Sequence, residues 1–369
     1  MSVAPLAVLG GGNGAHAMAA ELALAGHRVR LCEHPAFARA FQPTFERGAI
    51  EFIRDGRAAT APLELATTDL EAALEGVELI HVVIPTTGHE ALFDALLPRL
   101  RQGMAVVVWA GRLGALRLAS RLRQARPGVE MTVGETNTLP YGTRLTGPAR
   151  VEIFFTARRL FVGGWPGKAT ALLLGRLRPL FPGMQAVPHA LAAALSNPAV
   201  TVYAAGTLLN VGRIEFTGGE FYIFREGITP AVSRVIRALH GELERLAAAL
   251  GFALPQYAEA EFGPPLSLEG VEFQGSGLES FARLKGPTEV RHRYLLENVR
   301  DCLVPLVELG GLLDVAMPVA RAFIHLGSVL CGEPFLVTGH HIADLGLPSD
   351  PAALRVLCSA EPVDLPRES

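Results

Sequence analysis

The sequence has little of what marks a nucleic-acid-binding or membrane protein. Its 33 lysine and arginine residues are nearly matched by 36 aspartate and glutamate residues, which leaves a formal net charge of −3. A chain of this charge has no basic field that would attract a nucleic acid or an anionic membrane. No segment reaches the roughly 18 unbroken apolar residues that a membrane-spanning helix needs, because polar residues such as Asn13 and Asn197 interrupt the apolar runs. We therefore expect the partner to be a small molecule or a second copy of this chain.

Cysteine is equally scarce. The cysteines are scattered and form no Cys-x-x-Cys pair; they are Cys32, Cys302, Cys331 and Cys358. This spacing argues against a zinc site and against a disulfide framework, and it favours buried free thiols in a reducing compartment. The first residues also lack the basic region of a secretory signal peptide, and a strand-like apolar run begins almost at once. We therefore expect a cytoplasmic protein.

The first half of the chain alternates short apolar runs with helical stretches. A length of 369 residues is too great for one core and suits two domains. The expected strands span residues 6–9, 28–32, 79–84, 105–109 and 131–133. The expected helices span residues 14–25, 88–97 and 113–124. This alternation predicts a parallel sheet covered by helices on both faces. Residues 151–155 and 160–162 are expected to form a late antiparallel pair that closes the domain.

Beyond about residue 188 the spacing of apolar residues becomes helical. One apolar stripe, with steps of four and three, is formed by Val232, Ile236, Leu239, Leu243, Leu246 and Leu250. Thr229 and Pro230 supply a capping hydroxyl and a first-turn proline, and Gly251 supplies a stop. Further helices are expected over residues 294–309 and 312–329.

A glycine-rich loop joins the first expected strand to the first expected helix, which we take to be amphipathic. The loop reads Gly10-Gly11-Gly12-Asn13-Gly14-Ala15, a GxGxxA pattern. In such a loop Gly10 permits a tight turn, Gly12 lets the backbone approach a pyrophosphate, and Ala15 allows close packing of helix on strand. The helix N-terminus then faces the phosphates. Cofactor binding is therefore assigned to Gly10, Gly12, Asn13, Gly14 and Ala15.

Two domains of different class follow from these patterns. Residues 1–188 are expected to form an α/β Rossmann-type dinucleotide-binding domain. Residues 189–369 are expected to form an all-α helical domain that holds the substrate. The apolar helices of this second domain could also support a homodimer.

Glu33 ends the second expected strand, about 20 residues after the loop. A carboxylate at this position accepts hydrogen bonds from ribose hydroxyls and repels a 2′-phosphate, so NAD(H) is favoured over NADP(H). Arg28, Arg30 and His34 lie close enough in the sequence to weaken that preference.

Two further segments follow expected strands and so lie at the carboxyl edge of the sheet, where ligands bind. One begins at Pro85 and runs to His89, and the other contains Glu135 and Thr136. Pro85 and Glu135 are therefore further candidates for contact with the cofactor. His89 is interpreted more simply as the start of the next helix.

The glycine loop and several later blocks together resemble the opine dehydrogenase family, which includes octopine, nopaline and carboxyethyl-norvaline dehydrogenases. The blocks lie in order along nearly the whole chain, at residues 10–19, 134–141, 197–210, 225–230, 285–298 and 303–306. The resemblance implies a nucleotide-binding domain joined to an all-helical domain, with the active site in the cleft between them. It also implies the reaction: an amine and a 2-oxo acid condense, and NAD(P)H delivers hydride to the imine carbon.

The sequence departs from this family at the catalytic pair. Family members carry a histidine paired with an aspartate in the helical domain, acting as general acid and base. The block that reads NPxxxxHxxGxLLN in the family has Tyr203 where the histidine should stand. The block that reads RYxxED has Asn298 in place of the aspartate. Both members of the pair therefore differ together.

The exchange changes the chemistry that the site can support. A His–Asp pair moves protons near neutral pH. Tyrosine has a reference pKa of about 10, so Tyr203 can donate a proton or a hydrogen bond but is a poor base. Asn298 can orient a hydroxyl but cannot balance a cation. The pair suits reduction of a preformed imine, with Tyr203 as donor, Asn298 as its orienter and Arg293 as the anchor of a substrate carboxylate.

Three alternatives stay open at this point. The site could act on a carbonyl or an alcohol, since a phenol can protonate a developing alkoxide. The chain could instead be a catalytically degenerate protein that only binds a dinucleotide. The acid–base group could also be relocated, with His89 and His292 as candidates.

Overall fold

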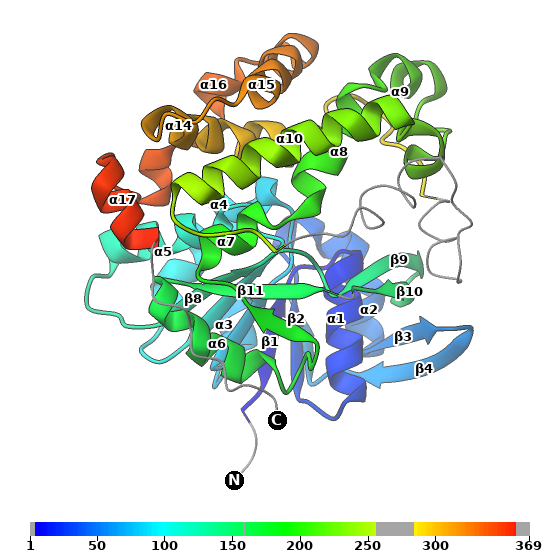
Figure 1. Ribbon diagram of the computed structural model, residues 1–369. Helices are drawn as coiled ribbons and strands as arrows, with labels where there is room; N and C mark the ends of the chain where they lie inside the picture. The colour runs from blue at the N-terminus through cyan, green and yellow to red at the C-terminus, as the bar shows by residue number, and fades with distance from the viewer. Residues whose placement is uncertain (1–3, 158, 256–283, 359–369) are drawn as a thin grey trace, which may run out of the picture. The chain divides into compact units, whose positions relative to one another are not determined.

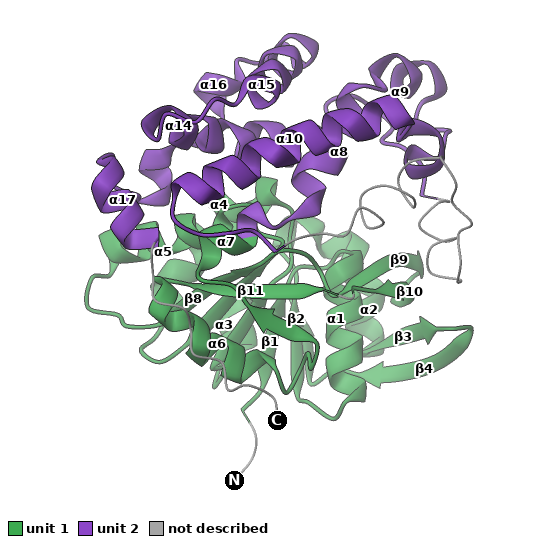
Figure 2. Cartoon of the chain, viewed as in Figure 1, with its two compact units in different colours: residues 1–193, 363–369 green, residues 194–362 purple. Residues whose placement is uncertain are grey.

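The computed structural model describes residues 4–157, 159–255 and 284–358. The chain forms two compact units, one ending at Ala193 and the other beginning at Ala194 (Figure 2). The boundary predicted between residues 188 and 189 falls just before this division. The first unit is α/β and the second is helical, so the predicted fold class is confirmed.

The first unit is built on an eight-stranded sheet with the order β12-β11-β8-β7-β6-β1-β2-β5 (Figure 1). Its strands are β1 (Leu6–Leu9), β2 (Val29–Cys32), β5 (Leu65–Thr67), β6 (Leu79–Val82), β7 (Ala105–Trp109), β8 (Thr132–Thr136), β11 (Leu160–Trp165) and β12 (Met184–Ala186). The six strands β8-β7-β6-β1-β2-β5 are each parallel to their neighbours in the sheet. Their order is that of a Rossmann fold. The order reverses between β1 and β6, and ligands bind at such a reversal point.

Helices connect these strands. They are α1 (Asn13–Leu24), α2 (Ala38–Arg47), α3 (Leu70–Leu74), α4 (His89–Leu96), α5 (Gly114–Ala125) and α6 (Thr170–Leu177), and α7 (Ala190–Leu195) crosses the division between the units. The strands predicted from residues 6 to 133 and the helices between them are confirmed, with shifts of a few residues at their ends. Every residue of β6 and β7 is buried, as expected for central strands of a parallel sheet that is covered on both faces.

A second sheet of four strands was not expected from the sequence. Its order is β4 (Arg57–Pro62), β3 (Ala49–Arg54), β10 (Arg150–Thr156) and β9 (Tyr141–Gly147). The antiparallel pair predicted for residues 151–155 and 160–162 is therefore wrong, because β10 pairs with β9 and β3 while β11 pairs with β8. Glycines favour the observed pairing: Gly134 lies opposite Gly164, and a Cβ on Gly134 would come within 2.7 Å of the Gly163 carbonyl oxygen.

Helix α1 lies between the two sheets, in contact with β1 and β2 on one side and with the second sheet on the other (Figure 1). Its buried residues therefore lie all around the helix and include His16, Met18 and Leu22. The prediction of an amphipathic helix is wrong here, because a helix covered on both sides has no solvent face to keep polar.

The described part of the second unit is formed mainly by helices. They are α8 (Pro198–Leu208), α9 (Val211–Thr217), α10 (Pro230–Ala249), α13 (Arg293–Leu295), α14 (Val304–Leu312), α15 (Pro318–Cys331), α16 (Phe335–Thr338) and α17 (Pro351–Cys358), with π-helical segments at Ile223–Gly227 and Leu296–Leu303 and a 3-10 turn at Ile342–Leu345. The long helix α10 is confirmed with its predicted cap, since Thr229 Oγ1 accepts a hydrogen bond from the Val232 N–H at 3.4 Å. All six residues of its predicted stripe are buried.

The remaining helices of this unit differ from their predicted bounds. Residues 294–309 do not form one regular α-helix, because a π-helical segment separates α13 from α14. The helix predicted from residue 312 begins only at Pro318. Asp314 stands before it with a φ of 60°, a conformation that no helix continues.

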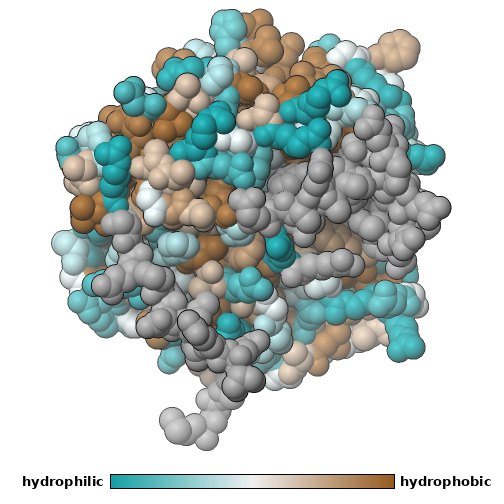
Figure 3. Space-filling model, viewed as in Figure 1, coloured by the Kyte–Doolittle hydropathy of each residue, from teal (hydrophilic) through white to brown (hydrophobic). Residues whose placement is uncertain are grey.

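Apolar residues lie in one long buried segment and at several exposed positions. The segment Ala190–Leu208 has the length and composition of a membrane span, but 83% of its most apolar window is buried within the protein, as in the core helix of a soluble domain. Apolar residues also reach the surface on α15 and α16; they are Leu326, Val329, Leu330, Leu336 and Val337. On the face shown in Figure 3 apolar residues alternate with polar ones.

All four cysteines are free thiols. A homodimer and a cytoplasmic location stay predictions.

Candidate functional site

The turn from β1 into α1 requires glycine at its first position. Gly10 has a φ of 127°, and its N–H donates to the Cys32 carbonyl at 2.7 Å. A Cβ at Gly10 would lie 2.4 Å from the carbonyl oxygen of Val83, at the end of the neighbouring strand β6. Both the backbone conformation and the close approach therefore exclude a side chain.

The later positions of the loop, Gly12, Gly14 and Ala15, differ in how much space they leave for a side chain. Gly12 precedes the first turn of α1, and a Cβ there would meet no atom within 4 Å. Gly14 has no such room, since a Cβ would lie 2.8 Å from Leu139 Cδ1. Ala15 is fully buried against the sheets. The helix N-terminus beside Gly12 carries no acidic residue in its first turn, so its dipole favours an anion in that open space.

Side chains fix the first turn of α1 from both sides. Asn13 Oδ1 accepts a hydrogen bond from the Leu145 N–H at 2.8 Å, which ties the loop to β9. His16 lies 3.2 Å from the Gly12 carbonyl through Nδ1 and 2.8 Å from Thr44 Oγ1 through Nε2. Burial lowers the pKa of His16, so its ring is neutral near pH 7. Asn13 as a ligand of the cofactor stays a prediction, and its contact with β9 could not be seen in the sequence.

Glu33 lies where the sequence placed it, directly after β2 and against the glycine loop. A Cβ on Gly11 would lie 2.4 Å from Glu33 Oε2, and the His34 N–H donates to Glu33 Oε1 at 2.6 Å. Burial raises the pKa of this carboxyl, and its backbone hydrogen bonds from His34 and Gly11 lower it. The arrangement brings the carboxylate to the loop at which a ribose would lie.

The two arginines near Glu33 in the sequence are directed elsewhere. Arg28 and Arg30 both form ion pairs with Glu64, and Arg30 Nε lies 2.8 Å from the Glu64 carboxylate. Arg30 also donates to the carbonyls of Ala72 and Glu75. Their positive charge is therefore already partnered within the protein.

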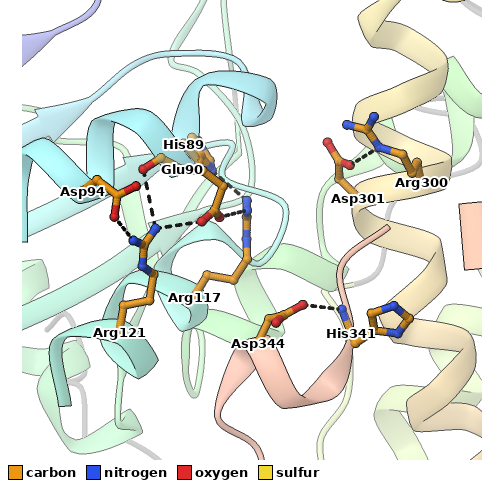
Figure 4. Close-up of polar contacts among 9 residues, drawn as sticks. All are labelled: His89, Glu90, Asp94, Arg117, Arg121, Arg300, Asp301, His341 and Asp344. Atoms are coloured by element: carbon orange, nitrogen blue, oxygen red, sulfur yellow. Dashed lines mark hydrogen bonds and ion pairs between the residues drawn. The ribbon is translucent and has the colours of Figure 1, made fainter. Parts of the chain in front are cut away.

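The segment after β6 contains Pro85 and His89. Pro85 is exposed and precedes a short turn. His89 is fully buried, stacks on Phe93 with ring centroids 5.0 Å apart, and accepts a hydrogen bond from Arg117 at 2.9 Å (Figure 4). Arg117 in turn pairs with Glu90 at 2.9 Å. A histidine held in this way lacks the access that a relocated acid–base group needs.

Glu135 has a different place from the one that the sequence suggested. Its side chain is fully buried, and its two oxygens accept hydrogen bonds from the backbone N–H groups of Leu113 and Ala115 at 2.9 and 3.0 Å. Burial raises its pKa to about 7, against the effect of those hydrogen bonds and of Arg117 and Arg112. The carboxylate caps the N-terminus of α5, which argues against its direct contact with a cofactor.

In the second unit, Tyr203 lies on α8 and is half-buried. The Asn197 side chain caps this helix by accepting from the Ala199 N–H at 2.9 Å. The Tyr203 ring stacks on Tyr294 with centroids 4.2 Å apart and meets the edge of Phe224 at 5.7 Å. Packing thus fixes the plane of the phenol. Tyr294 was not singled out from the sequence, although it stands beside Arg293 in the RYxxEN block.

Asn298 and Arg293 also converge on Tyr294. The buried Asn298 donates from Nδ2 to the Tyr294 carbonyl at 2.7 Å. The exposed Arg293 holds its guanidinium over the Tyr294 ring, 5.4 Å from the centroid. His292 accepts a hydrogen bond from the Tyr294 N–H at 3.2 Å and packs against its ring. The structure therefore brings together the catalytic residues predicted from the sequence, with Tyr294 at their centre.

Comparison with known proteins points first to the opine dehydrogenases. Residues 186–331 match the family model described as the alpha-helical domain of NAD/NADP octopine/nopaline dehydrogenase. The chain is 29% identical over 346 residues to an opine dehydrogenase of Arthrobacter sp. (strain 1C), covering 92% of this chain and 94% of that protein.

Solved structures agree with this fold. Yersinopine dehydrogenase with NADP+ superposes with a TM-score of 0.70 at 18% identity, over 97% of this chain and 98% of that one. Octopine dehydrogenase with NADH and pyruvate gives a TM-score of 0.66 at 19% identity, over 95% of each chain.

Proposed function

The chain belongs to the opine dehydrogenase family, and on that premise we propose that it reduces the C=N bond of a small, amino-acid-derived imine. Family membership makes it an NAD(P)-dependent oxidoreductase. The finer assignment rests on one observation: Tyr203 and Asn298, which the resemblance between sequence blocks aligns with the family's histidine and aspartate, both contact Tyr294.

The residues of the first unit fit a dinucleotide. The open space at Gly12 and the N-terminus of α1 suit a pyrophosphate. Glu33, against Gly11, suits the ribose hydroxyls. When bound, the nicotinamide supplies the hydride.

We propose that NAD(H) is preferred over NADP(H). One solved relative carries NADH and another carries NADP+, so the fold alone does not decide between them. The preference rests on the carboxylate of Glu33, which would repel a 2′-phosphate. Arg28 and Arg30 are both held by Glu64, whose single carboxylate offsets one of their two positive charges and directs both guanidinium groups toward itself.

A site that has a proton donor but no base is sufficient for the reduction of an imine. A protonated imine accepts hydride at carbon and becomes an amine without any further proton transfer. A neutral imine needs one proton at nitrogen, and the Tyr203 hydroxyl can donate it and recover it from solvent. Neither route requires the base that a His–Asp pair supplies during condensation of an amine with a 2-oxo acid.

Arg293 is proposed as the anchor of the substrate carboxylate. Its guanidinium is exposed and has its position set by the Tyr294 ring. The planar fork of arginine matches a carboxylate through two parallel hydrogen bonds. Asn298 is proposed to orient the cluster through the Tyr294 backbone.

Substrate competition tests this function directly. The purified protein is given NADH with three substrate sets: preformed cyclic imines bearing a carboxylate, mixtures of amine and 2-oxo acid, and 2-oxo acids alone. We expect the highest kcat/KM with the preformed imines. Turnover of 2-oxo acids alone at the highest rate would instead identify a carbonyl reductase. NADH binding without turnover of any set would identify a degenerate, cofactor-binding protein.

A further inference from the structure

The loop between β7 and α5 has an unusual backbone. Ala110, Arg112 and Leu113 have φ values of 51°, 47° and 72°, in the left-handed region that side chains with a Cβ disfavour. Non-glycine residues persist there only where their surroundings hold them, and such positions cluster at functional sites. The loop follows a central parallel strand, so it lies at the carboxyl edge of the sheet, where cofactors bind.

Two residues at the end of β8 hold this loop. Glu135 accepts hydrogen bonds from the N–H groups of Leu113 and Ala115 at 2.9 and 3.0 Å. Thr136 Oγ1 accepts one from the Ala110 N–H at 3.1 Å. The backbone amides of the left-handed stretch are therefore fixed by side chains of the neighbouring strand.

Close contacts connect the loop to the phosphate-binding turn. A Cβ on Gly111 would lie 3.0 Å from the Glu135 carboxyl carbon, and one on Gly114 would lie 2.6 Å from His89 Cε1. A Cβ on Gly88, next to His89, would lie 3.2 Å from Ile84 Cδ1. The adjacent Val83 lies against Gly10. Glycines of the two loops thus lie directly against neighbouring segments: Gly111 against Glu135 of β8, Gly114 against His89 of α4, and Gly10 against Val83.

Two arginines act on the Glu135 carboxylate. Arg112 comes from the loop and Arg117 from α5, and both favour its ionised form. Behind Arg117 lie His89 and Glu90 at the start of α4, both bonded to the Arg117 guanidinium (Figure 4).

We propose that Glu135 is a positioning residue for the cofactor: its carboxylate does not touch the dinucleotide, but holds the β7–α5 loop in the conformation that receives it. This inference rests on the proposed function, since it concerns binding of the same nicotinamide dinucleotide. Protonation of Glu135 removes one acceptor and places an O–H against a backbone N–H. Either Leu113 or Ala115 then loses its partner, and the left-handed stretch relaxes. Because the pKa of Glu135 is raised to about 7, cofactor affinity should fall as the pH drops through that value.

The test compares two matched variants. Glu242 has the same chemistry in the second unit: it is buried and accepts from the Val319 and Ala320 N–H groups at the start of α15, at 2.7 and 2.9 Å. The dissociation constant of NADH is measured by cofactor fluorescence from about pH 6 to about pH 8.5, on both sides of that pKa, for the wild type, Glu135→Gln and Glu242→Gln. Thermal melting of each protein reports the loss of a helix cap.

We expect the wild type to bind NADH about tenfold more weakly at the acid end, because only the fraction with an ordered loop binds. Glu135→Gln should bind weakly at every pH, with a flat profile. Glu242→Gln should melt earlier but keep the wild-type affinity and profile. Glu135→Asp, which keeps a carboxylate, should keep a pH-dependent profile at reduced affinity.

Other outcomes separate the possible failures. A flat wild-type profile overturns the proposal even if Glu135→Gln does not fold. If all the variants had the same NADH affinity and the same pH profile, Glu135 would be only a helix cap like Glu242, and the proposal would be overturned as well. Absence of NADH binding by the wild type at any pH overturns the proposed function and this inference together.

Discussion

Tyr203 stacks face to face on Tyr294, with ring centroids 4.2 Å apart and ring planes at 15°. Tyr294 also receives a hydrogen bond from Asn298 on its carbonyl and carries the Arg293 guanidinium over its ring. Tyr203 and Asn298 are thus linked through a third residue. In this arrangement Asn298 sets the backbone that carries Tyr294, and the stack sets the plane of the Tyr203 phenol.

Removing the Tyr203 hydroxyl should abolish most of the reaction. Tyr203→Phe keeps the stack and the contact with Phe224, so the fold and NADH affinity should stay nearly unchanged. Loss of a general acid should lower kcat on an imine by about 10²–10⁴-fold. Tyr294→Phe removes the other hydroxyl of the same stack and should cost much less. An unchanged kcat for Tyr203→Phe would leave this residue a packing role, and His292 would be the next acid to test.

Restoring the family pair should change the preferred substrate. The double variant Tyr203→His with Asn298→Asp supplies a base and a carboxylate that can stabilise an imidazolium. We expect kcat/KM to rise for amine and 2-oxo acid mixtures relative to preformed imines. Each single variant serves as a control, because a histidine without its aspartate should gain little. If the double variant showed no change in this ratio, the paired replacement would not explain the chemistry.

A side chain at Gly12 should block the cofactor without harming the fold. A Cβ at this position meets no protein atom within 4 Å, so Gly12→Val fits the structure but fills the space at the start of α1. NADH affinity should fall by at least about 100-fold, which corresponds to about 3 kcal/mol, with an unchanged melting temperature. Gly10→Ala is the contrasting variant and should melt earlier, because its methyl group would strike the Val83 carbonyl. Unchanged fluorescence titration of Gly12→Val would place the cofactor elsewhere.

Coenzyme preference should depend on Glu33. The wild type should show a higher kcat/KM with NADH than with NADPH. Glu33→Ser should lower the ratio of these two values by about tenfold, because the hydrogen bond from the ribose to a charged carboxylate is lost and the repulsion of a 2′-phosphate is removed. Glu64→Gln is a useful companion, because it releases Arg28 and Arg30 from their ion pairs. A wild-type advantage for NADPH would show that the nearby positive charge outweighs the Glu33 carboxylate.

The ion pair between His341 and Glu308 should make stability depend on pH. His341 Nδ1 lies 2.6 Å from Glu308 Oε1, and this hydrogen bond raises the pKa of His341 above its ordinary value of 6.5. The His341 N–H also donates to Asp344 (Figure 4). A raised histidine pKa stabilises the fold fully below 6.5, and that contribution is lost as the pH rises through the folded-state value.

The effect should be small, because the His341 side chain is 35% exposed and solvent screens such a pair, to below about 1 kcal/mol. Melting temperatures of the wild type and Glu308→Gln are compared at a pH below 6.5 and at one above the folded-state pKa. The two proteins should differ at the lower pH and converge at the higher one. Taking this difference cancels the contributions of other titrating groups, including Glu135. A constant difference at both pH values would mean that His341 carries no charge in the folded protein.

Local patterns in the sequence determined much of the fold. The strand Leu6–Leu9, the glycine loop and Glu33 define the start of a dinucleotide-binding fold, because a tight turn and a helix N-terminus depend on residues a few positions apart. The stripe and the Thr229 cap fixed α10 for the same reason. The site residues Tyr203, Arg293 and Asn298 came from a resemblance between blocks, which gave their positions along the chain but not their contacts.

Only the tertiary structure decided the rest. The second sheet pairs β3 with β10, which lie about a hundred residues apart, and it encloses α1 so that this helix has no polar face. The proposed role of Glu135 depends on the backbone amides of Ala115 and Leu113, 20 and 22 residues earlier in the chain. The stack of Tyr203 on Tyr294 depends on two helices meeting. Which distant groups meet is set by strand pairing and core packing over the whole unit, and no local pattern of residues encodes it.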